Sequence, residues 1–357
     1  MEKFGFIIHP ISAKKDVARK YPIAGFLPES FIEFVMTYKS PVFVSEITGI
    51  KSPAGKEAEG VFVGCPLCTR QFMNLPAEFC YKRIIQTVKL AEERGAKICG
   101  LGAFTSVVGD GGITVAKNSG IAITTGNSFT VSTAIDGSLK GADILGKDPK
   151  KSKVAIVGAA GSIGRTCALI YSDIAENIIL VGRNKDKLET VKKELNSKAK
   201  VTIANSVEEG IREADIVVTV SSAVDSIIEP EYIKSGAVIC DVARPRDVSV
   251  KVAKERNDVL VMEGGVVSVP GDVNFNFNFG FPPKTAYACM SETMILALEG
   301  KYENFSLGKE LSVEKVREIK ALSEKHGFVL SGFRSFEKAV SEEDIEKIKK
   351  NINVQRN

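Results

Sequence analysis

The chain has 357 residues, of which 44% are hydrophobic and 26% charged, a composition that excludes a disordered or fibrous protein. Basic residues exceed acidic residues by only four, far fewer than phosphate-backbone binding requires, so nucleic acid is not an expected partner. No segment offers about 18 uninterrupted apolar residues, and we therefore predict a cytoplasmic protein without a membrane span.

Strand-like and helix-like patterns alternate in the first part of the chain. Short β-rich runs occur at 4–8, 41–47, 60–64 and 121–124, and helical periodicity occurs at 29–36 and 76–94. A polar segment that contains proline, at 148–153, ends this region. We predict an α/β N-terminal substrate domain at residues 1–149.

Continuously apolar runs dominate the next part of the chain, at 154–157, 178–181, 216–220, 237–240 and 259–262. Such runs are typical of strands buried on both faces, and helical stretches such as 185–194 separate them. A series of this kind forms a parallel sheet covered by helices, so we predict a Rossmann-type domain at residues 150–268. A mostly helical C-terminal region, residues 269–357, follows.

A glycine fingerprint follows the first apolar run. Gly158, Gly161 and Gly164 precede a helical stretch, with Ser162 and Ile163 between the last two glycines. Glycines allow the backbone to approach a pyrophosphate, and the N-terminus of the helix attracts its negative charge. The pattern predicts dinucleotide binding.

Arg183 favours NADPH over NADH as the cofactor. It follows the second apolar run, where an acidic residue would hold the ribose 2′-hydroxyl of NAD and a guanidinium suits a 2′-phosphate. Asn184 and Lys187 are further candidates for the same phosphate, although a surface arginine is the alternative interpretation. Ser221 ends another run at the sheet edge where a nicotinamide would lie, or else it is a turn residue.

The seven cysteines are an odd number spread over a long chain, which does not indicate a disulfide framework. Cys65 and Cys68 form a CxxC pair without further ligands, so we expect no metal site. Cys289 lies in a helical stretch, and if Thr285 is the N-cap, the helix dipole would lower its thiol pKa slightly. Glu292 shares its face. From pattern alone, a small buried thiol is the simpler interpretation of Cys289.

The two histidines have different expected roles. His9 ends the run at 4–8 and is either an acid or base at the edge of a sheet or a hydrogen-bonded turn residue. His326 fits a cation at the C-terminus of a helix that begins after Ser312 and stops at Gly327.

Several strings along the chain resemble the long-chain fatty acyl-(acyl carrier protein) reductases that form fatty aldehydes in cyanobacterial alkane biosynthesis. Their order and spacing match from residue 4 to residue 328. The strings are 4–9, 100–106, Thr124-Thr-Gly-Asn-Ser128, the nucleotide loop, 263–267, Ala288-Cys-Met-Ser-Glu-Thr-Met294, 299–300 with 304–306, and 326–328.

The resemblance implies that Cys289 carries the acyl group as a thioester and that NADPH reduces it to the aldehyde. The substrate would be a fatty acyl thioester of acyl carrier protein or coenzyme A, and an aldehyde-consuming enzyme would be a partner. For this reaction we assign Asn127 and backbone amides near Thr125 or Thr105 as oxyanion donors, and His9 as the proton donor. Glu292 completes the predicted catalytic group.

Two features concern the substrate. Phe129 stands where the family often has histidine, which removes a polar group. The alternating Phe275, Phe277, Phe279 and Phe281 would line an acyl channel, although a half-buried strand explains the same alternation.

Two other classes remain open. The predicted sheet and the Arg183–Asn184 pair also resemble shikimate dehydrogenases and glutamyl-tRNA reductases, and shikimate-type chemistry would not require Cys289. A non-catalytic NADPH-sensing protein would use the same nucleotide loop without turnover.

Overall fold

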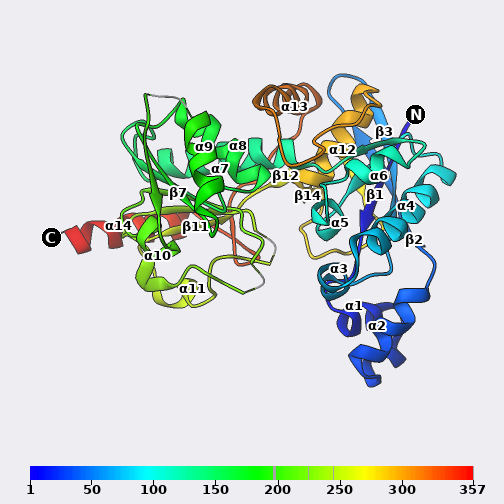
Figure 1. The fold of residues 1–357 in the computed structure, drawn as a ribbon. Helices are drawn as coiled ribbons and strands as arrows, with labels where there is room; N and C mark the ends of the chain where they lie inside the picture. The colour runs from blue at the N-terminus through cyan, green and yellow to red at the C-terminus, as the bar shows by residue number, and fades with distance from the viewer. Residues whose placement is uncertain (196–197, 224, 244, 357) are drawn as a thin grey trace. The chain divides into compact units, whose positions relative to one another are not determined.

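The computed structural model describes residues 1–195, 198–223, 225–243 and 245–356 and divides into two units, each assembled from separate stretches of chain (Figure 1). Unit 1 comprises residues 1–126, 267–309 and 318–329, and unit 2 comprises residues 127–266, 310–317 and 330–357. Both units combine helices with a six-stranded sheet, which confirms the predicted α/β class. The C-terminal segment 269–357 contributes to both units.

Unit 1 is built on a mixed sheet. Its strands are β1 (Glu2–Ile8), β2 (Val42–Lys51), β3 (Glu57–Gly64), β4 (Ile98–Leu101), β5 (Ala122–Thr124) and β13 (Gly271–Asn274). They lie in the order β13-β2-β3-β1-β4-β5. The four strands from β3 to β5 in this order are parallel, whereas β2 runs antiparallel to both β3 and β13.

Two long helices cover opposite faces of this sheet. The helices of unit 1 are α1 (Ala13–Lys20), η1 (Pro22–Phe26), α2 (Glu29–Tyr38), α3 (Thr69–Asn74), α4 (Ala77–Glu93), α5 (Phe104–Val107), α6 (Ile113–Lys117) and α12 (Ala288–Glu299). Gly5 of β1 faces Ala91 of α4, and Gly100 of β4 faces Thr293 of α12. A small sheet in the order β14-β12-β15 joins β14 (Thr285–Tyr287), β12 (Val266–Ser268) and β15 (Val329–Leu330). The strand β14 of this small sheet is followed directly by α12.

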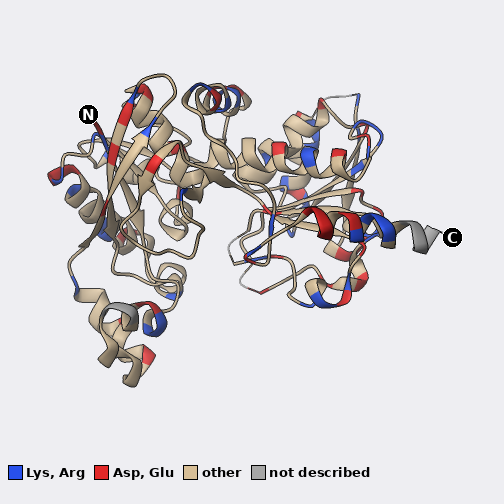
Figure 2. Cartoon of the chain, turned by 180° about the vertical axis from the view of Figure 1, so that it is seen from behind, with Lys and Arg blue, Asp and Glu red and all other residues tan. Residues whose placement is uncertain are grey.

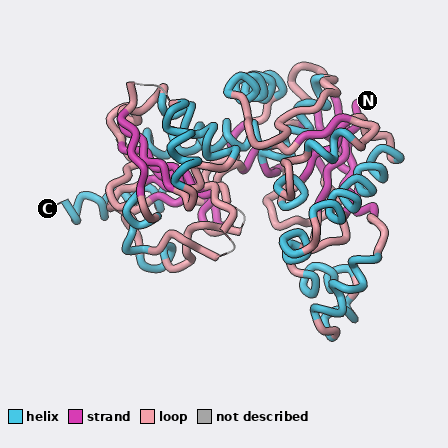
Figure 3. Tube along the Cα trace, in the orientation of Figure 1, coloured by secondary structure: helices cyan, strands magenta, loops and turns pink. Residues whose placement is uncertain are grey.

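Unit 2 is built on a parallel sheet, the central magenta strands on the C-terminal side of Figure 3. Its strands are β6 (Lys153–Val157), β7 (Asn177–Val181), β8 (Lys200–Ala204), β9 (Ile216–Thr219), β10 (Val238–Asp241) and β11 (Leu260–Glu263). All six pair in parallel in the order β11-β10-β9-β6-β7-β8. This is the doubly wound order, in which strand succession reverses between β6 and β9.

Helices cover both faces of the parallel sheet. The helices of unit 2 are α7 (Asn127–Ile144), α8 (Ser162–Ser172), α9 (Lys185–Glu194), α10 (Val207–Ile211), η2 (Pro230–Tyr232), α11 (Val252–Glu255) and α14 (Glu342–Arg356). One apolar core packs α7, α8 and α9 on the sheet, and a second core packs α10 and α11 on the opposite face. The hairpin of β16 (Arg334–Ser335) and β17 (Lys338–Ala339) completes the unit. A Rossmann-type sheet is therefore confirmed.

The helix α13 (Val313–His326) is divided between the units. Its first turn is capped as predicted, because Ser312 Oγ accepts the Lys315 amide at 3.1 Å. His326 ends it as a fully buried side chain that hydrogen-bonds Ser52 Oγ through Nδ1 and Glu299 through Nε2, each at 2.9 Å. Among the described residues, no helix has the length and apolarity that a bilayer crossing would need.

Candidate active site

The nucleotide loop lies at the carboxyl end of β6 in unit 2. Gly158 has φ +84°, and its carbonyl accepts the Gly161 amide at 3.0 Å, which closes a tight turn. A Cβ on Gly164 would lie 2.3 Å from the Gly158 carbonyl oxygen, so only glycine permits α8 to begin so close to the turn. Ser162 and Ile163 form the partly exposed first turn of α8. These features fit a pyrophosphate at the helix N-terminus.

Arg183 is exposed two residues after the end of β7. Asn184 is the N-cap of α9, and its side chain accepts the Lys187 amide at 3.0 Å. The amide oxygen of Asn184 therefore has a structural partner, which leaves the exposed Arg183 and Lys187 cations as the stronger candidates for a phosphate.

Ser221 follows β9 at the carboxyl edge of the same sheet, across the reversal point from β7. Ser221 donates hydrogen bonds to the carboxylate of Asp247, a residue that the sequence pattern did not indicate. Fully buried Asp247 accepts the Ser221 amide at 3.0 Å and the Ser221 hydroxyl at 2.5 Å, and it also accepts the Thr219 hydroxyl. No local pattern marks Asp247, because its partners lie on a strand earlier in the chain.

Only one of the seven cysteines, all of which lie in the described ranges, is not buried. Cys65, Cys68, Cys80, Cys99, Cys167 and Cys240 are buried, whereas Cys289 is partly exposed. Burial raises the pKa of the Cys65 thiol to about 12, and it raises the pKa of Cys99 and of Cys167 still further. Because the thiolate is the nucleophile, these buried thiols are poor candidates for acyl transfer.

The helix that carries Cys289 begins later than the sequence pattern suggested. Its N-cap is Tyr287, and Cys289 is the second residue of α12. Thr285 instead lies in β14, and its hydroxyl donates to the Pro282 carbonyl at 2.8 Å. Cys289 therefore lies nearer the positive end of the helix dipole than a Thr285 cap would have placed it.

The turn after β5 packs directly on Cys289. A Cβ on Gly126 would lie 2.2 Å from the Cys289 Cα, so the Gly126 backbone touches the first turn of α12. The Thr124 hydroxyl donates to the carboxylate of Glu292, and the Gly126 amide donates to Thr124 Oγ1 at 3.2 Å. Glu292 is fully buried, so its contact with Thr124 ties this turn to α12.

The predicted oxyanion donors lie in different settings. The Thr105 amide donates to the Gly102 carbonyl at 3.1 Å, so it already has a partner. The Thr125 hydroxyl donates to the Ser306 carbonyl. Asn127 directly follows Gly126 and begins α7, while Phe129, two residues further on, is buried.

His9 has backbone partners on both ring nitrogens. Nε2 accepts the Phe104 amide at 3.1 Å, so the proton lies on Nδ1, which donates to the Pro10 carbonyl at 3.0 Å. Burial lowers the His9 pKa. This neutral ring joins the end of β1 to the loop before α5, which fits the turn-forming interpretation better than the acid.

An aromatic track leads along unit 1 to the residue before α12. It comprises Phe62, Phe275, Phe277, Phe279, Phe281 and Tyr287. Phe62 and Phe279 centroids are 5.8 Å apart, Phe279 and Phe281 are 5.6 Å apart, and Phe281 and Tyr287 are 4.3 Å apart. Because β13 ends at Asn274, the half-buried strand does not explain the alternation of the phenylalanines.

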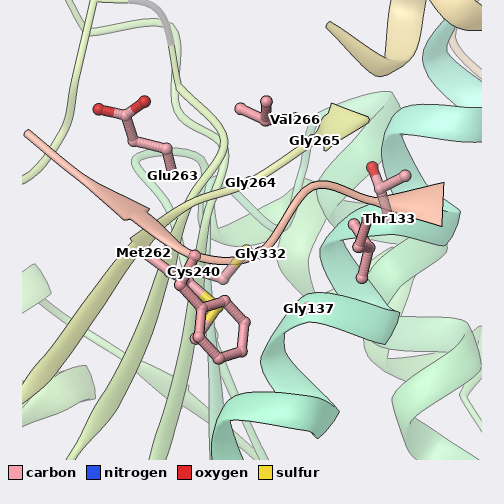
Figure 4. A pocket seen from close by; sticks show the side chains of 11 residues that line it. Thr133, Gly137, Cys240, Met262, Glu263, Gly264, Gly265, Val266 and Gly332 are labelled. Atoms are coloured by element: carbon pink, nitrogen blue, oxygen red, sulfur yellow. The ribbon is translucent and has the colours of Figure 1, made fainter. Parts of the chain in front are cut away.

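A small cavity of about 10 Å³ lies in unit 2 where the β11–β12 connection passes α7 (Figure 4). Thr133 and Gly137 of α7 line it together with Cys240 and Met262. A space of this size holds one water at most, so it is not a site for nucleotide or substrate. Within the described ranges no group of three or more His, Cys, Asp or Glu could hold a metal ion.

Comparisons with known proteins found relatives of the nucleotide domain and of nearly the whole chain. Residues 141–263 match the shikimate/quinate 5-dehydrogenase family model. The chain is 28% identical to the long-chain acyl-[acyl-carrier-protein] reductase of Synechococcus elongatus over 342 residues, 91% of this chain and 98% of that protein. It is 30% identical over 361 residues to the aminotransferase PigE of a Serratia species, 98% of this chain but 42% of PigE. Over 97 residues, 27% of this chain and 21% of that protein, it is 31% identical to the glutamyl-tRNA reductase of Natronomonas pharaonis.

The fold and these matches define an NAD(P)-dependent oxidoreductase with a nucleotide domain like that of shikimate dehydrogenases. Over nearly its whole length the chain is a distant homologue of the cyanobacterial acyl reductase and of part of PigE, and it spans less than half of PigE.

Proposed function

We propose that this protein reduces a long-chain acyl thioester to a fatty aldehyde with NADPH, through an acyl group carried by Cys289. The observation that carries this proposal is that Cys289 is the one cysteine of seven outside the buried core, at the second position of α12. A thiol there has the exposure and the helix-dipole environment that favour a reactive thiolate.

The first step would be an exchange between thioesters. The Cys289 thiolate attacks the acyl carbonyl carbon, the bond to the carrier sulfur breaks, and the carrier thiolate takes a proton from solvent. Because one thioester replaces another, the exchange is nearly balanced in free energy. The site mainly has to present a thiolate and donors for the developing oxyanion, for which we propose Asn127 and the backbone around Thr125.

When bound, NADPH would supply the hydride that converts the Cys289 thioester to a thiohemiacetal alkoxide. Breaking the carbon–sulfur bond of that alkoxide releases the aldehyde and returns the Cys289 thiolate. This collapse needs no added proton, so the neutral His9 ring need not act as an acid. We propose instead that His9 positions the loop before α5.

The residues of the nucleotide loop fit the cofactor on physical grounds. Gly158 takes a positive φ in the tight turn, and Gly164 lets α8 begin directly beside that turn, where its N-terminus can face a pyrophosphate. Arg183 offers an exposed guanidinium near the expected ribose. We propose that Arg183, with Lys187, binds the 2′-phosphate of NADPH, and that Ser221, held by Asp247, contacts the nicotinamide side.

The aromatic track supports a long acyl chain as the substrate. Tyr287 is two residues before Cys289, and the rings continue from it to Phe62. A continuous series of aromatic rings that ends two residues before Cys289 suits a hydrocarbon chain better than a polar metabolite. Glu292 would act as a positioning residue through Thr124 rather than by touching the substrate.

The alternative oxidoreductases have narrower support. The shikimate-type match covers residues 141–263, which hold the nucleotide loop but neither Cys289 nor the aromatic track.

Aldehydes are also substrates of aminotransferases, the class named for the longer relative PigE. We therefore propose that the aldehyde passes to an aldehyde-consuming partner enzyme.

The test is to incubate the full chain with palmitoyl thioesters of coenzyme A and of acyl carrier protein, without NADPH, and to seek an acyl adduct by mass spectrometry. Added NADPH should then release hexadecanal. Cys289→Ala should abolish the adduct while NADPH binding, measured by fluorescence, is retained. The matched control, Cys65→Ala, removes a buried thiol and should keep the adduct. An adduct that persists in Cys289→Ala would refute the proposal.

A further inference from the structure

We propose that an exposed apolar face of the N-terminal helices docks on an anionic lipid surface. We use the term apolar face for two groups of exposed side chains in this helical segment: a stripe on α2, formed by Phe31, Phe34, Val35 and Tyr38, and a tip on η1, formed by Ile23 and Phe26. Both α2 and η1 pack on α1. The side chains are strongly exposed: Phe26 by 89%, Tyr38 by 75%, Ile23 by 72% and Phe34 by 62%.

The apolar face is not needed for the core of these helices. The opposite side of α2 packs Ile32 and Met36 against Ala13, Ala24 and Cys68. α2 therefore carries two apolar stripes. The outer stripe, at 31, 34, 35 and 38, has the spacing of one face of an amphipathic helix, the face that usually packs on another surface. Clustered exposed apolar side chains of this kind mark interaction sites.

Charge around the apolar face favours an anionic partner. Residues 10–40 include five basic and three acidic residues. Within α2 the charged residues are Glu29 and Glu33, and most of this helix is therefore tan in Figure 2. Glu33 pairs with Arg70, and Glu29 accepts the Ser12 hydroxyl at 2.9 Å.

The basic residues, by contrast, remain available. Within the part of the chain that the structure describes, Lys14, Lys15 and Lys39 form no ion pair. A second copy of the same face would bring like charges together, which opposes a symmetric dimer through this surface.

The shape of the tip favours a bilayer over an acidic protein. Ile23 and Phe26 stand out from a short 3₁₀ turn, and Figure 1 shows α1 and α2 at the end of unit 1, beyond α3. Protruding aliphatic and aromatic side chains with lysines beside them bind by entering the headgroup region of anionic lipid. Protein partners instead require a packed, complementary pocket around such anchors.

This inference does not depend on the proposed reaction, because its readout is binding. The full chain is sedimented with vesicles of phosphatidylcholine alone, and with vesicles of equal parts phosphatidylcholine and phosphatidylglycerol, at low and high salt. We expect association with the anionic vesicles that weakens with salt. The double variant Phe26→Ser/Phe34→Ser should bind at least about tenfold more weakly.

Two controls separate the causes. Val250→Ser removes a side chain that is 61% exposed in unit 2 and should leave vesicle binding unchanged. Lys14→Gln/Lys15→Gln should reduce the preference for anionic vesicles. Circular dichroism and thermal unfolding check that each variant folds.

Three results would overturn the proposal: no association with either vesicle, equal binding by the Phe26→Ser/Phe34→Ser variant, or a partner other than lipid. That partner would be a second copy if the same double variant abolished concentration-dependent self-association in sedimentation velocity. It would be an acidic protein if the variant lost only its binding to acyl carrier protein.

Discussion

The close approach of Gly126 to Cys289 allows a quantitative prediction for Gly126→Ala. Gly126 has φ +74°, a conformation that costs an L-residue roughly 1–2 kcal/mol. The added Cβ would lie 2.2 Å from the Cys289 Cα and 2.5 Å from the Cys289 carbonyl oxygen, so backbone must move. Overpacking of this kind adds about 1–3 kcal/mol, and we expect a total loss of roughly 2–5 kcal/mol in the free energy of unfolding.

Gly55 offers a matched control in the same unit. It has φ +75°, but a Cβ on Gly55 would meet no atom within 4 Å, so Gly55→Ala should show only the conformational cost of roughly 1–2 kcal/mol. Urea unfolding of the three proteins, followed by circular dichroism, measures the difference. The rate at which palmitoyl coenzyme A acylates the Cys289 thiol should fall in Gly126→Ala and stay unchanged in Gly55→Ala.

Equal destabilisation by the two substitutions would refute the contact between the 124–126 turn and α12. If Gly126→Ala destabilised the protein without changing the acylation rate, the contact with α12 would be supported, but its influence on the Cys289 thiol would be refuted.

Three further predictions concern other parts of the molecule. Arg183→Ala should weaken NADPH binding roughly 10- to 100-fold, the worth of hydrogen bonds to a charged group, and should leave NADH binding nearly unchanged; equal losses in titrations with both nucleotides would exclude a phosphate contact. Asp247→Asn places an amide N–H₂ against the hydroxyl and amide donors of Thr219 and Ser221, so it should cost about 1–3 kcal/mol in urea unfolding; an unchanged midpoint would argue against this network. Burial lowers the His9 pKa below its ordinary 6.5, so the unfolded chain binds the proton more readily and stability should fall as the pH drops below 6.5; His9→Gln should reduce that loss between about pH 7 and pH 5, and an unchanged slope would contradict it.

The strands buried on both faces could be predicted closely from the sequence. The runs at 154–157, 178–181 and 216–220 correspond to β6, β7 and β9, and the helical stretch 185–194 is α9. Continuous apolar runs have few other stable environments. The edge strand β8 was missed because its half-exposed residues alternate, and such a pattern competes with that of a surface helix or loop.

The surroundings of Cys289 could not be predicted from local pattern. Thr285 has the chemistry of an N-cap, yet pairing of β14 with β12 and the hydrogen bond to Pro282 take it away from the helix. The Thr124–Glu292 hydrogen bond joins residues 168 positions apart. Contacts of this kind depend on how β5 and α12 pack in the folded unit, and no spacing rule encodes them.

The choice among reductases therefore depends on residues outside the nucleotide domain. Hydride transfer is the chemistry of the cofactor, and the shikimate-type match at residues 141–263 covers only the domain that would hold it. Cys289, Gly126 and the aromatic track all lie in unit 1. An enzyme that reduces a carbon–oxygen double bond directly has no use for a thiol, whereas a thioester reductase that works through an enzyme-bound acyl group cannot turn over without one. Loss of turnover in Cys289→Ala, with NADPH binding and unfolding free energy unchanged, is thus expected for an acyl-cysteine mechanism. Full turnover by that variant on any acyl thioester would refute the acyl-cysteine mechanism and the role of Cys289 in it.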